Sequence, residues 1–233
     1  MSKYRLEEVT SFYQNYSYPS VKMIWEVSQN ALRMIKGVYR FKYFEEYISQ
    51  KKSSNQEDKK SEYWTASYHE LIVDYIKISI AFENYNKVAL LRKGYLIHKI
   101  DRKFNKKLYK NQVNGIPVKV EDFLKNNFTS FESSNSKAKL NGLNEKLFTI
   151  NYLDTLNDRH QEIIGLEPQF IVELKKINKK RNQLHFFIDF KGAHEVNRYI
   201  QQWTYIKDMS LDLIEKQFKE VDKELENILK NLK

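Results

Sequence analysis

The sequence contains no cysteine, which excludes disulfide bonds, thiolate catalysis and thiolate metal sites. Glycine and proline are also scarce, with six and three residues in a chain of 233. Because these two residues interrupt regular structure, their scarcity favours long helices over a β fold with many turns. Charged residues interrupt the most apolar stretch, 71–100, so no run reaches the roughly 20 apolar residues that span a bilayer.

Several signatures of common enzyme classes are missing as well. The chain has no glycine-rich phosphate loop, no His-Glu-x-x-His pattern and no nucleophile elbow, which argues against NTPases, Rossmann oxidoreductases and hydrolases of that kind. The histidines show no metal-ligand spacing, so we expect no metal and no cofactor. The first residues contain no apolar signal core, and we therefore expect a cytoplasmic protein without a membrane partner.

The excess of positive charge is the main compositional feature. The formal net charge is +10 and the isoelectric point is near 9.4. Such a balance is typical of proteins that bind a polyanion. The alternative is that an AT-rich genome places lysine and asparagine on solvated helix faces.

Apolar periodicity predicts an all-α, single-domain helical bundle with a long C-terminal helix. We expect a mobile loop at about 50–62 and a long connector at about 126–144 within one domain, 1–233, and a domain boundary at the connector is the alternative. A short hairpin over 113–120 is also expected. The predicted helices cover 19–49, 64–100, 120–127, 145–164, 168–187 and 193–232.

The last predicted helix carries a heptad-like seam. Its apolar residues recur at alternating steps of three and four, as in a coiled coil. This seam packs either within the bundle or between two chains. Its members are Leu211, Ile214, Phe218, Val221, Leu225, Ile228 and Leu232.

Polar residues interrupt the apolar stripe of the helix predicted over 168–187. Arg181 falls on the stripe between Ile177 and Leu184, and His185 follows it by one helical turn. A guanidinium facing a core is costly unless it is paired, and the pKa of a histidine is within reach of neutral pH. These residues therefore form either a polar network between helices, in which Glu83 is a candidate buried partner of Arg181, or a functional site.

The stretch Arg181-Asn182-Gln183-Leu184-His185 resembles the motif of the HEPN superfamily (higher eukaryotes and prokaryotes nucleotide-binding). Those small all-helical domains carry an arginine, a polar residue and a histidine near the end of a core helix, and a long helix follows. Three residues separate Arg181 from His185, where the ribonuclease members have four to six. Residues four apart on a straight helix still point to one side.

The resemblance implies a metal-independent endoribonuclease, of the toxin or antiviral-defence type common among HEPN proteins. His185 would be the general acid or base, Arg181 would stabilise charge on the phosphate, and Asn182 would orient a phosphoryl oxygen. The family commonly pairs two protomers around one cleft, so we expect a homodimer, with a protein inhibitor as a further partner. The alternative is a non-catalytic helical module that binds RNA, nucleotide or a protein.

Two groups of lysines are candidates for binding RNA phosphates. The first precedes the motif on its helix, and the second lies in a basic stretch interleaved with aromatic residues. Lysines on solvated helix faces are the alternative explanation of both groups. The candidates are Lys175, Lys176, Lys179, Lys180, Lys103, Lys106 and Lys107.

Overall fold

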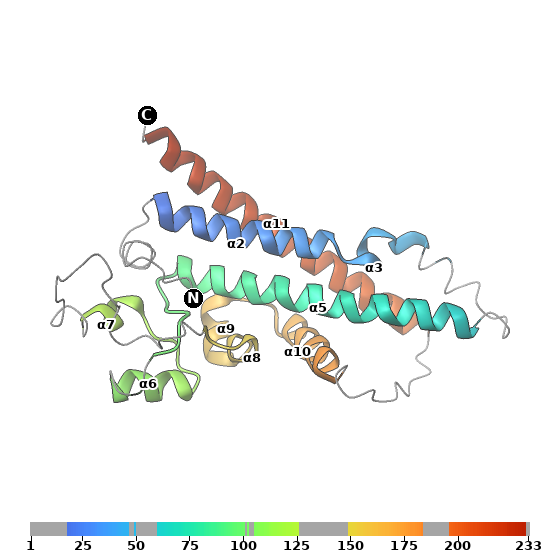
Figure 1. Cartoon of the computed structure of the whole chain (residues 1–233), viewed down its shortest axis with the longest axis horizontal. Helices are drawn as coiled ribbons and strands as arrows, with labels where there is room; N and C mark the ends of the chain where they lie inside the picture. Colours follow the sequence, from blue (N-terminus) through green and yellow to red (C-terminus); the bar gives the residue numbers. More distant parts are fainter. Residues whose placement is uncertain are drawn as a thin grey trace, which may run out of the picture. The chain divides into compact units, whose positions relative to one another are not determined.

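The computed structural model describes residues 18–46, 49, 60–100, 102, 105–125, 149–183 and 196–231. These residues are mostly helical and contain no β-strand, only two isolated β-bridges, which confirms the predicted all-α fold (Figure 1). The helices are α2 (Tyr18–Lys36), α3 (Tyr39–Lys42), α5 (Lys60–Arg92), α6 (Lys106–Val113), α7 (Val120–Lys125), α8 (Tyr152–Thr155), α9 (Asp158–Ile164), α10 (Pro168–Gln183) and α11 (Val196–Asn231).

The chain forms two compact units. The first unit comprises 1–28, 83–166 and 218–233, and the second unit comprises 29–82 and 167–217. The connector predicted over 126–144 lies outside the described residues. A single domain over 1–233 stays a prediction.

The predicted helix over 19–49 is wrong in its length, because the chain breaks after α2 and continues as the single turn α3. Gly37 closes α2 through backbone hydrogen bonds to its last turn. The carboxylate of Asp74, on α5, accepts the backbone N–H groups of Tyr39 and Arg40 at 2.7 and 3.1 Å. A side chain distant in sequence thus satisfies the first N–H groups of α3, which periodicity alone does not show.

The predicted helix over 64–100 is too long at its C-terminal end. Gly94 adopts φ +76°, a left-handed conformation that glycine tolerates. The N–H of Tyr95 donates to Leu90 O at 2.9 Å and the N–H of Gly94 donates to Leu91 O at 3.0 Å, the hydrogen-bond pair of a Schellman motif. The apolar residues beyond it continue the stripe in sequence but not in structure.

The hairpin predicted over 113–120 is also wrong. The chain that leaves α6 pairs with the segment after α5: Leu96 N–H donates to Val118 O at 2.8 Å, and Val120 N–H donates to Gly94 O at 3.0 Å. The short helix predicted over 120–127 is confirmed as α7.

Two short helices, α8 and α9, replace much of the single helix predicted over 145–164. The side chain of Asn157 interrupts it by capping α9, with its Oδ1 accepting the backbone N–H of His160 at 2.9 Å. Gly165, at φ +86°, ends α9. The asparagine side chain competes in this way with helical backbone hydrogen bonding. The apolar spacing that predicted a single helix does not reveal such a cap.

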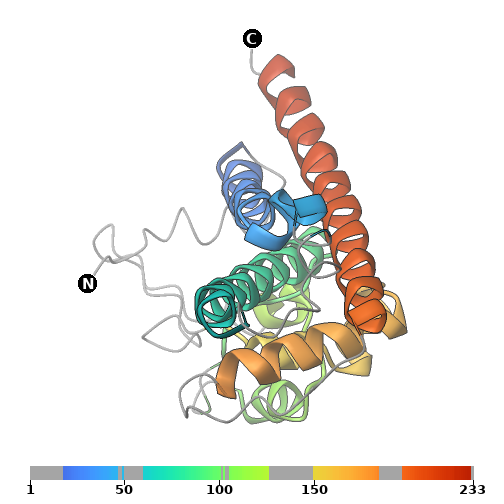
Figure 2. The same ribbon diagram turned by 90° about the vertical axis from the view of Figure 1, so that its right-hand side faces the viewer.

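The last two helices agree with the prediction. α10 lies within the predicted 168–187, and α11 comprises 36 residues. Both views draw α11 as one continuous ribbon (Figures 1 and 2). The seam residues Ile214 and Val221 are fully buried. At least this part of the seam therefore packs within the chain.

Two apolar clusters stand out among the described residues of the first unit. In one, Ile24 of α2, Val88 of α5 and Val221 of α11 pack together, and Trp25 Nε1 donates to Asp222 at 2.6 Å. The other joins the segment after α5 to α6 and α7 through Leu96, Ile100, Leu108, Val118, Val120 and Phe123. Because this cluster covers one face of α6, the opposite face is left to solvent.

Aromatic rings hold the second unit together. Phe82 of α5 meets Phe170 of α10 edge to face, with ring centroids 5.0 Å apart. Trp203 of α11 stacks on Tyr75 of α5 at 5.9 Å and contacts Phe41 of α3 at 6.1 Å. These contacts fix α10 within the unit and so position its C-terminal end.

Candidate catalytic and RNA-binding site

The apolar face of α10 anchors the candidate site. Phe170, Leu174 and Ile177 are buried, as the predicted stripe requires. The stripe then reaches Arg181, which is half-buried, in the last turn of α10. Arg181, the first motif residue, therefore lies where the buried face of α10 reaches the surface.

The side chains of Arg181 and Asn182 lie together at this end of α10. Arg181 Nε donates to Asn182 Oδ1 at 3.3 Å in an exposed hydrogen bond, and Asn182 itself is exposed. Among the residues that the structure describes in this unit, the partner of Arg181 is thus an amide oxygen and not a carboxylate. The third motif residue, His185, lies outside the described residues, so its predicted role stays a prediction.

Glu83, the candidate partner of Arg181, has a partner on its own helix. Its Oε1 accepts a hydrogen bond from Lys87 Nζ at 2.6 Å, one turn further along α5. Lys87 also donates to Thr149 Oγ1 at 2.9 Å. The pairing of Glu83 with Arg181 stays a prediction.

The four lysines before the motif differ in their surroundings. Lys175, Lys176 and Lys179 are exposed, and Lys176 forms an ion pair with Glu173 at 2.7 Å. Lys180 is partly buried, with Nζ 3.3 Å from the hydroxyl of Tyr75 and 5.5 Å from the centre of its ring. The exposed lysines suit phosphate binding better than Lys180 does.

The environment of Lys180 also changes its acidity. Burial lowers the pKa of Lys180, and the neighbouring ammonium of Lys176 lowers it further, while Glu173 acts in the opposite direction. A cation–π contact with Tyr75 keeps the ammonium close to the ring. We therefore assign Lys180 to the packing between α5 and α10 as well as to the positive field of the site.

The second group of candidate lysines lies in the first unit. Lys106 and Lys107 are exposed in the first turn of α6, and Lys103 lies outside the described residues. Asn105 caps the helix by accepting the backbone N–H groups of Lys107 and Leu108 at 3.0 and 3.1 Å. The predicted basic stretch therefore includes a capped helix that presents lysine to solvent.

Sequence reasoning missed the buried ion pair of the second unit. Arg40 of α3 and Asp74 of α5 are 3.0 Å apart between Nη1 and Oδ2, with side chains 4% and 0% exposed. The guanidinium carbon of Arg40 lies 5.3 Å from the ring centre of Trp203. The signal in the sequence was Asp74, a carboxylate inside the most apolar helix. The second unit thus contains a buried arginine–carboxylate ion pair, formed by Arg40 and Asp74.

A histidine of the first unit has an unusual environment. Burial, with a smaller contribution from the Lys87 ammonium, lowers the pKa of His98 to about 4. The backbone of His98 forms an isolated antiparallel bridge with Thr149, and its carbonyl accepts Gln112 Nε2 at 2.7 Å. His98 is therefore neutral at physiological pH and belongs to a structural polar cluster.

Comparison of the chain with family models, with curated proteins and with solved structures gives no significant match. Over the described part of the chain, no group of three or more acidic or histidine side chains is arranged to hold a metal ion. Within the same residues, none of the helices has the length and apolarity needed to cross a membrane.

Proposed function

We propose that the chain is a HEPN-like, metal-independent endoribonuclease whose site lies at the C-terminal end of α10. The proposal rests on the motif Arg181-Asn182-x-x-His185 and on its resemblance to the HEPN ribonucleases. The observation that supports it is the exposed hydrogen bond between Arg181 and Asn182. A purely structural clasp would favour a buried, carboxylate-paired Arg181, because an unpaired buried charge is costly.

In this mechanism the ribose 2′-oxygen bonds to phosphorus while the bond from phosphorus to the 5′-oxygen breaks. The products are a 2′,3′-cyclic phosphate and a free 5′-hydroxyl. His185 either takes the proton from the 2′-hydroxyl, with water supplying the proton to the leaving 5′-oxygen, or supplies that second proton while water takes the first. Arg181 offers a planar pair of donors to the non-bridging oxygens, and Asn182 orients one of them.

The exposed lysines of α10 supply the electrostatic part of the proposal. Lys175 and Lys179 reach solvent on the helix that carries the motif. Positive charge beside a reactive site raises the local concentration of RNA and speeds its association. Replacing Lys179 should therefore weaken RNA binding and flatten its salt dependence without removing the chemical step.

The first test is cleavage of end-labelled single-stranded RNA by wild type and by variants of the motif, with and without a chelator. His185→Ala should lower the rate about a hundred- to ten-thousand-fold, the usual loss when general acid–base help is removed. Arg181→Lys should also lower the rate strongly, because lysine keeps the charge but loses the planar fork. The chelator should have no effect.

Two matched controls separate the site from general changes of charge. Arg198→Lys alters an exposed arginine of α11 in the same unit, and His69→Ala removes a histidine outside the motif. Both should cleave like wild type. Cleavage that survives His185→Ala, or wild type that cleaves no RNA offered, would favour the non-catalytic RNA-, nucleotide- or protein-binding module instead.

The toxin or antiviral-defence role is proposed on the same resemblance. A ribonuclease of this type should arrest growth when it is overexpressed, and His185→Ala should abolish the arrest. Growth curves of cells that express equal amounts of both proteins measure this. Equal toxicity of the two proteins would show that the arrest does not come from the motif.

A further inference from the structure

The stretch from Lys93 to Lys119 is almost free of negative charge. It contains eight lysines and arginines and one acidic residue, Asp101. Among its described residues Arg102, Lys106, Lys107, Lys110 and Lys119 are exposed. Positive charge therefore accumulates here without the alternating carboxylates of an ordinary solvated helix face.

The structure holds this stretch firmly. The side-chain amide of Gln112, on α6, forms two hydrogen bonds with the backbone of the segment after α5. Its Nε2 donates to His98 O at 2.7 Å, and its Oε1 accepts the N–H of Ile100 at 2.8 Å. At the same C-terminal end of α6, Arg159 Nη1 of α9 donates to Asn114 O at 3.1 Å. Arg159 is itself exposed and adds a cation where α6 ends.

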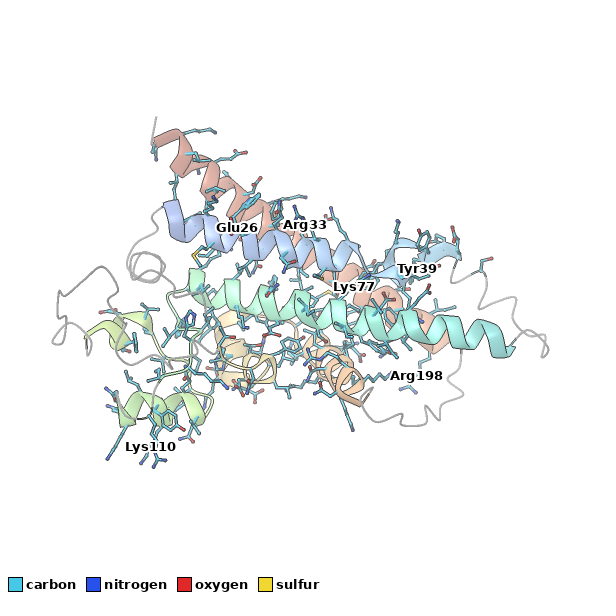
Figure 3. The ribbon with its side chains drawn as sticks, in the orientation of Figure 1. Glu26, Arg33, Tyr39, Lys77, Lys110 and Arg198 are labelled. Atoms are coloured by element: carbon cyan, nitrogen blue, oxygen red, sulfur yellow. The ribbon has the colours of Figure 1, made fainter. Side chains whose placement is uncertain are left out.

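The fold also separates the two faces of α6. At 100° per residue, Lys106, Lys107 and Lys110 fall within an arc of about 100°, and Leu108 and Gln112 lie on the opposite side. Leu108 is buried in the apolar cluster that joins α6 to α7. Figure 3 shows the side chain of Lys110 pointing away from the α6 ribbon. The three lysines thus form one cationic face, which we call the α6 face.

The chemistry of the α6 face fits a phosphate backbone better than a membrane surface. A helix that binds at a membrane surface inserts its apolar side into the lipid, but the apolar side of α6 is used in the protein core. The face offers three exposed ammonium groups and one small exposed apolar side chain, Val113, but no aromatic or deeply buried apolar anchor of the kind found at protein interfaces. Ammonium groups without such anchors are typical of sequence-independent contacts with phosphates.

We infer that the α6 face, Lys106, Lys107 and Lys110, binds the phosphodiester backbone of single-stranded RNA. This function goes beyond the cleavage chemistry proposed for the second unit, because it requires neither His185 nor Arg181. Arg159, which is exposed and donates to Asn114 O at the end of α6, adds a further positive charge there. The face contributes affinity for RNA of any sequence.

The test measures binding in the full-length His185→Ala protein, so that RNA stays intact. A fluorescent 30-nucleotide uridine oligomer, which has no base pairing, is titrated at several salt concentrations and followed by anisotropy. Replacing all three lysines, K106Q/K107Q/K110Q, should weaken binding on the order of 10- to 100-fold near 0.1 M salt. The slope of log K against log salt should become shallower by about 2, since each lost contact to a single strand contributes about 0.7.

The matched control removes the same charge elsewhere in the first unit. K22Q/K219Q/K223Q replaces three exposed lysines of α2 and α11 and leaves the α6 face intact. This control should bind RNA within about threefold of the parent protein, and all proteins should have similar melting temperatures because every replaced side chain is exposed. Equal weakening in both triple variants would overturn the inference, since net charge alone would explain the binding.

Two further outcomes contradict the inference. One is a parent protein that does not bind the uridine oligomer at low salt. The other is that K106Q/K107Q/K110Q keeps its RNA affinity but loses binding to vesicles of phosphatidylserine and phosphatidylcholine. If cleavage by wild type fails while the α6 face binds RNA as expected, only the proposed catalysis is rejected.

Discussion

At the residue scale, the second unit contains a buried ion pair between Arg40 and Asp74. Both side chains are almost fully buried, and Asp74 additionally accepts two backbone N–H groups of α3. The pair thus fixes a turn of helix and supports the ring of Trp203 at once. Taking two charges out of water is expensive, so removing one partner is worse than removing both.

We expect Asp74→Ala to lower the free energy of unfolding by about 3–5 kcal/mol, because it leaves the Arg40 guanidinium buried without its carboxylate. The double variant R40M/D74A should lose less than the two single variants together. It should still lose about 1–2 kcal/mol, the usual cost of a missing helix cap. Urea unfolding of the three variants measures these values, and strict additivity would contradict the coupling.

Acid should destabilise the first unit through His98. Its pKa is about 4 in the folded protein and about 6.5 in the unfolded chain. Between these values only the unfolded chain takes up the proton, so the free energy of unfolding falls as the pH drops from 6.5 towards 4 and the effect levels off below. Burial lowers the pKa of His160 too, which adds in the same direction.

From pH 7.5 to pH 5 the expected contribution of His98 is about 2 kcal/mol of lost stability. Urea unfolding at both pH values measures it. The His98→Gln variant, which cannot titrate at this position, should lose about 2 kcal/mol less over the same interval. An identical pH dependence of wild type and variant would show that His98 is not the cause.

At the element scale, glycines mark where several helices end, and Gly94 and Gly115 allow a direct comparison. Gly94 terminates α5 at φ +76°, and Gly115 follows α6 at φ +70°. The space around them differs: nothing lies within 4 Å of a Cβ added at Gly94, but a Cβ at Gly115 would meet Asn157 Nδ2 at 2.6 Å. Asn157 also donates to Gly115 O, so its side chain is held in place.

We therefore expect Gly94→Ala to cost about 1 kcal/mol, the backbone strain of a left-handed alanine. Gly115→Ala should cost clearly more, because the added methyl group also displaces Asn157. Gly94→Asn should cost less than Gly94→Ala, since asparagine tolerates this conformation. Thermal unfolding monitored by circular dichroism ranks the three variants, and equal losses for Gly94→Ala and Gly115→Ala would contradict the steric argument.

At the scale of the whole molecule, we expect a homodimer, the assembly in which HEPN motifs commonly line one cleft. Light scattering at tens of micromolar should give about twice the chain mass of 28.1 kDa. Because the motif at the end of α10, and not the seam of α11, is expected to line the shared cleft, Ile228→Glu near the end of α11 should leave the dimer intact. A monomer mass for wild type would reject both the dimer and a composite site.

The sequence by itself determined the helical class and the location of the longest helices. Apolar residues at steps of three and four specify which face of α10 and α11 is buried, and few glycines or prolines interrupt them. The same pattern placed Arg181 on the apolar stripe of α10, between Ile177 and Leu184. These features are local, since they depend only on residues within a few turns of one another.

Tertiary structure alone decided where several helices stop and which arginine is buried. Asp74 caps α3 although it lies 34 positions from Arg40 in the sequence. The segment after Gly94 pairs with the backbone that follows α6 and does not extend α5. Such contacts satisfy backbone and charged groups across distant parts of the chain, and hydrophobic periodicity carries no information about them. For the same reason periodicity could not show that Arg40 forms a buried ion pair with Asp74.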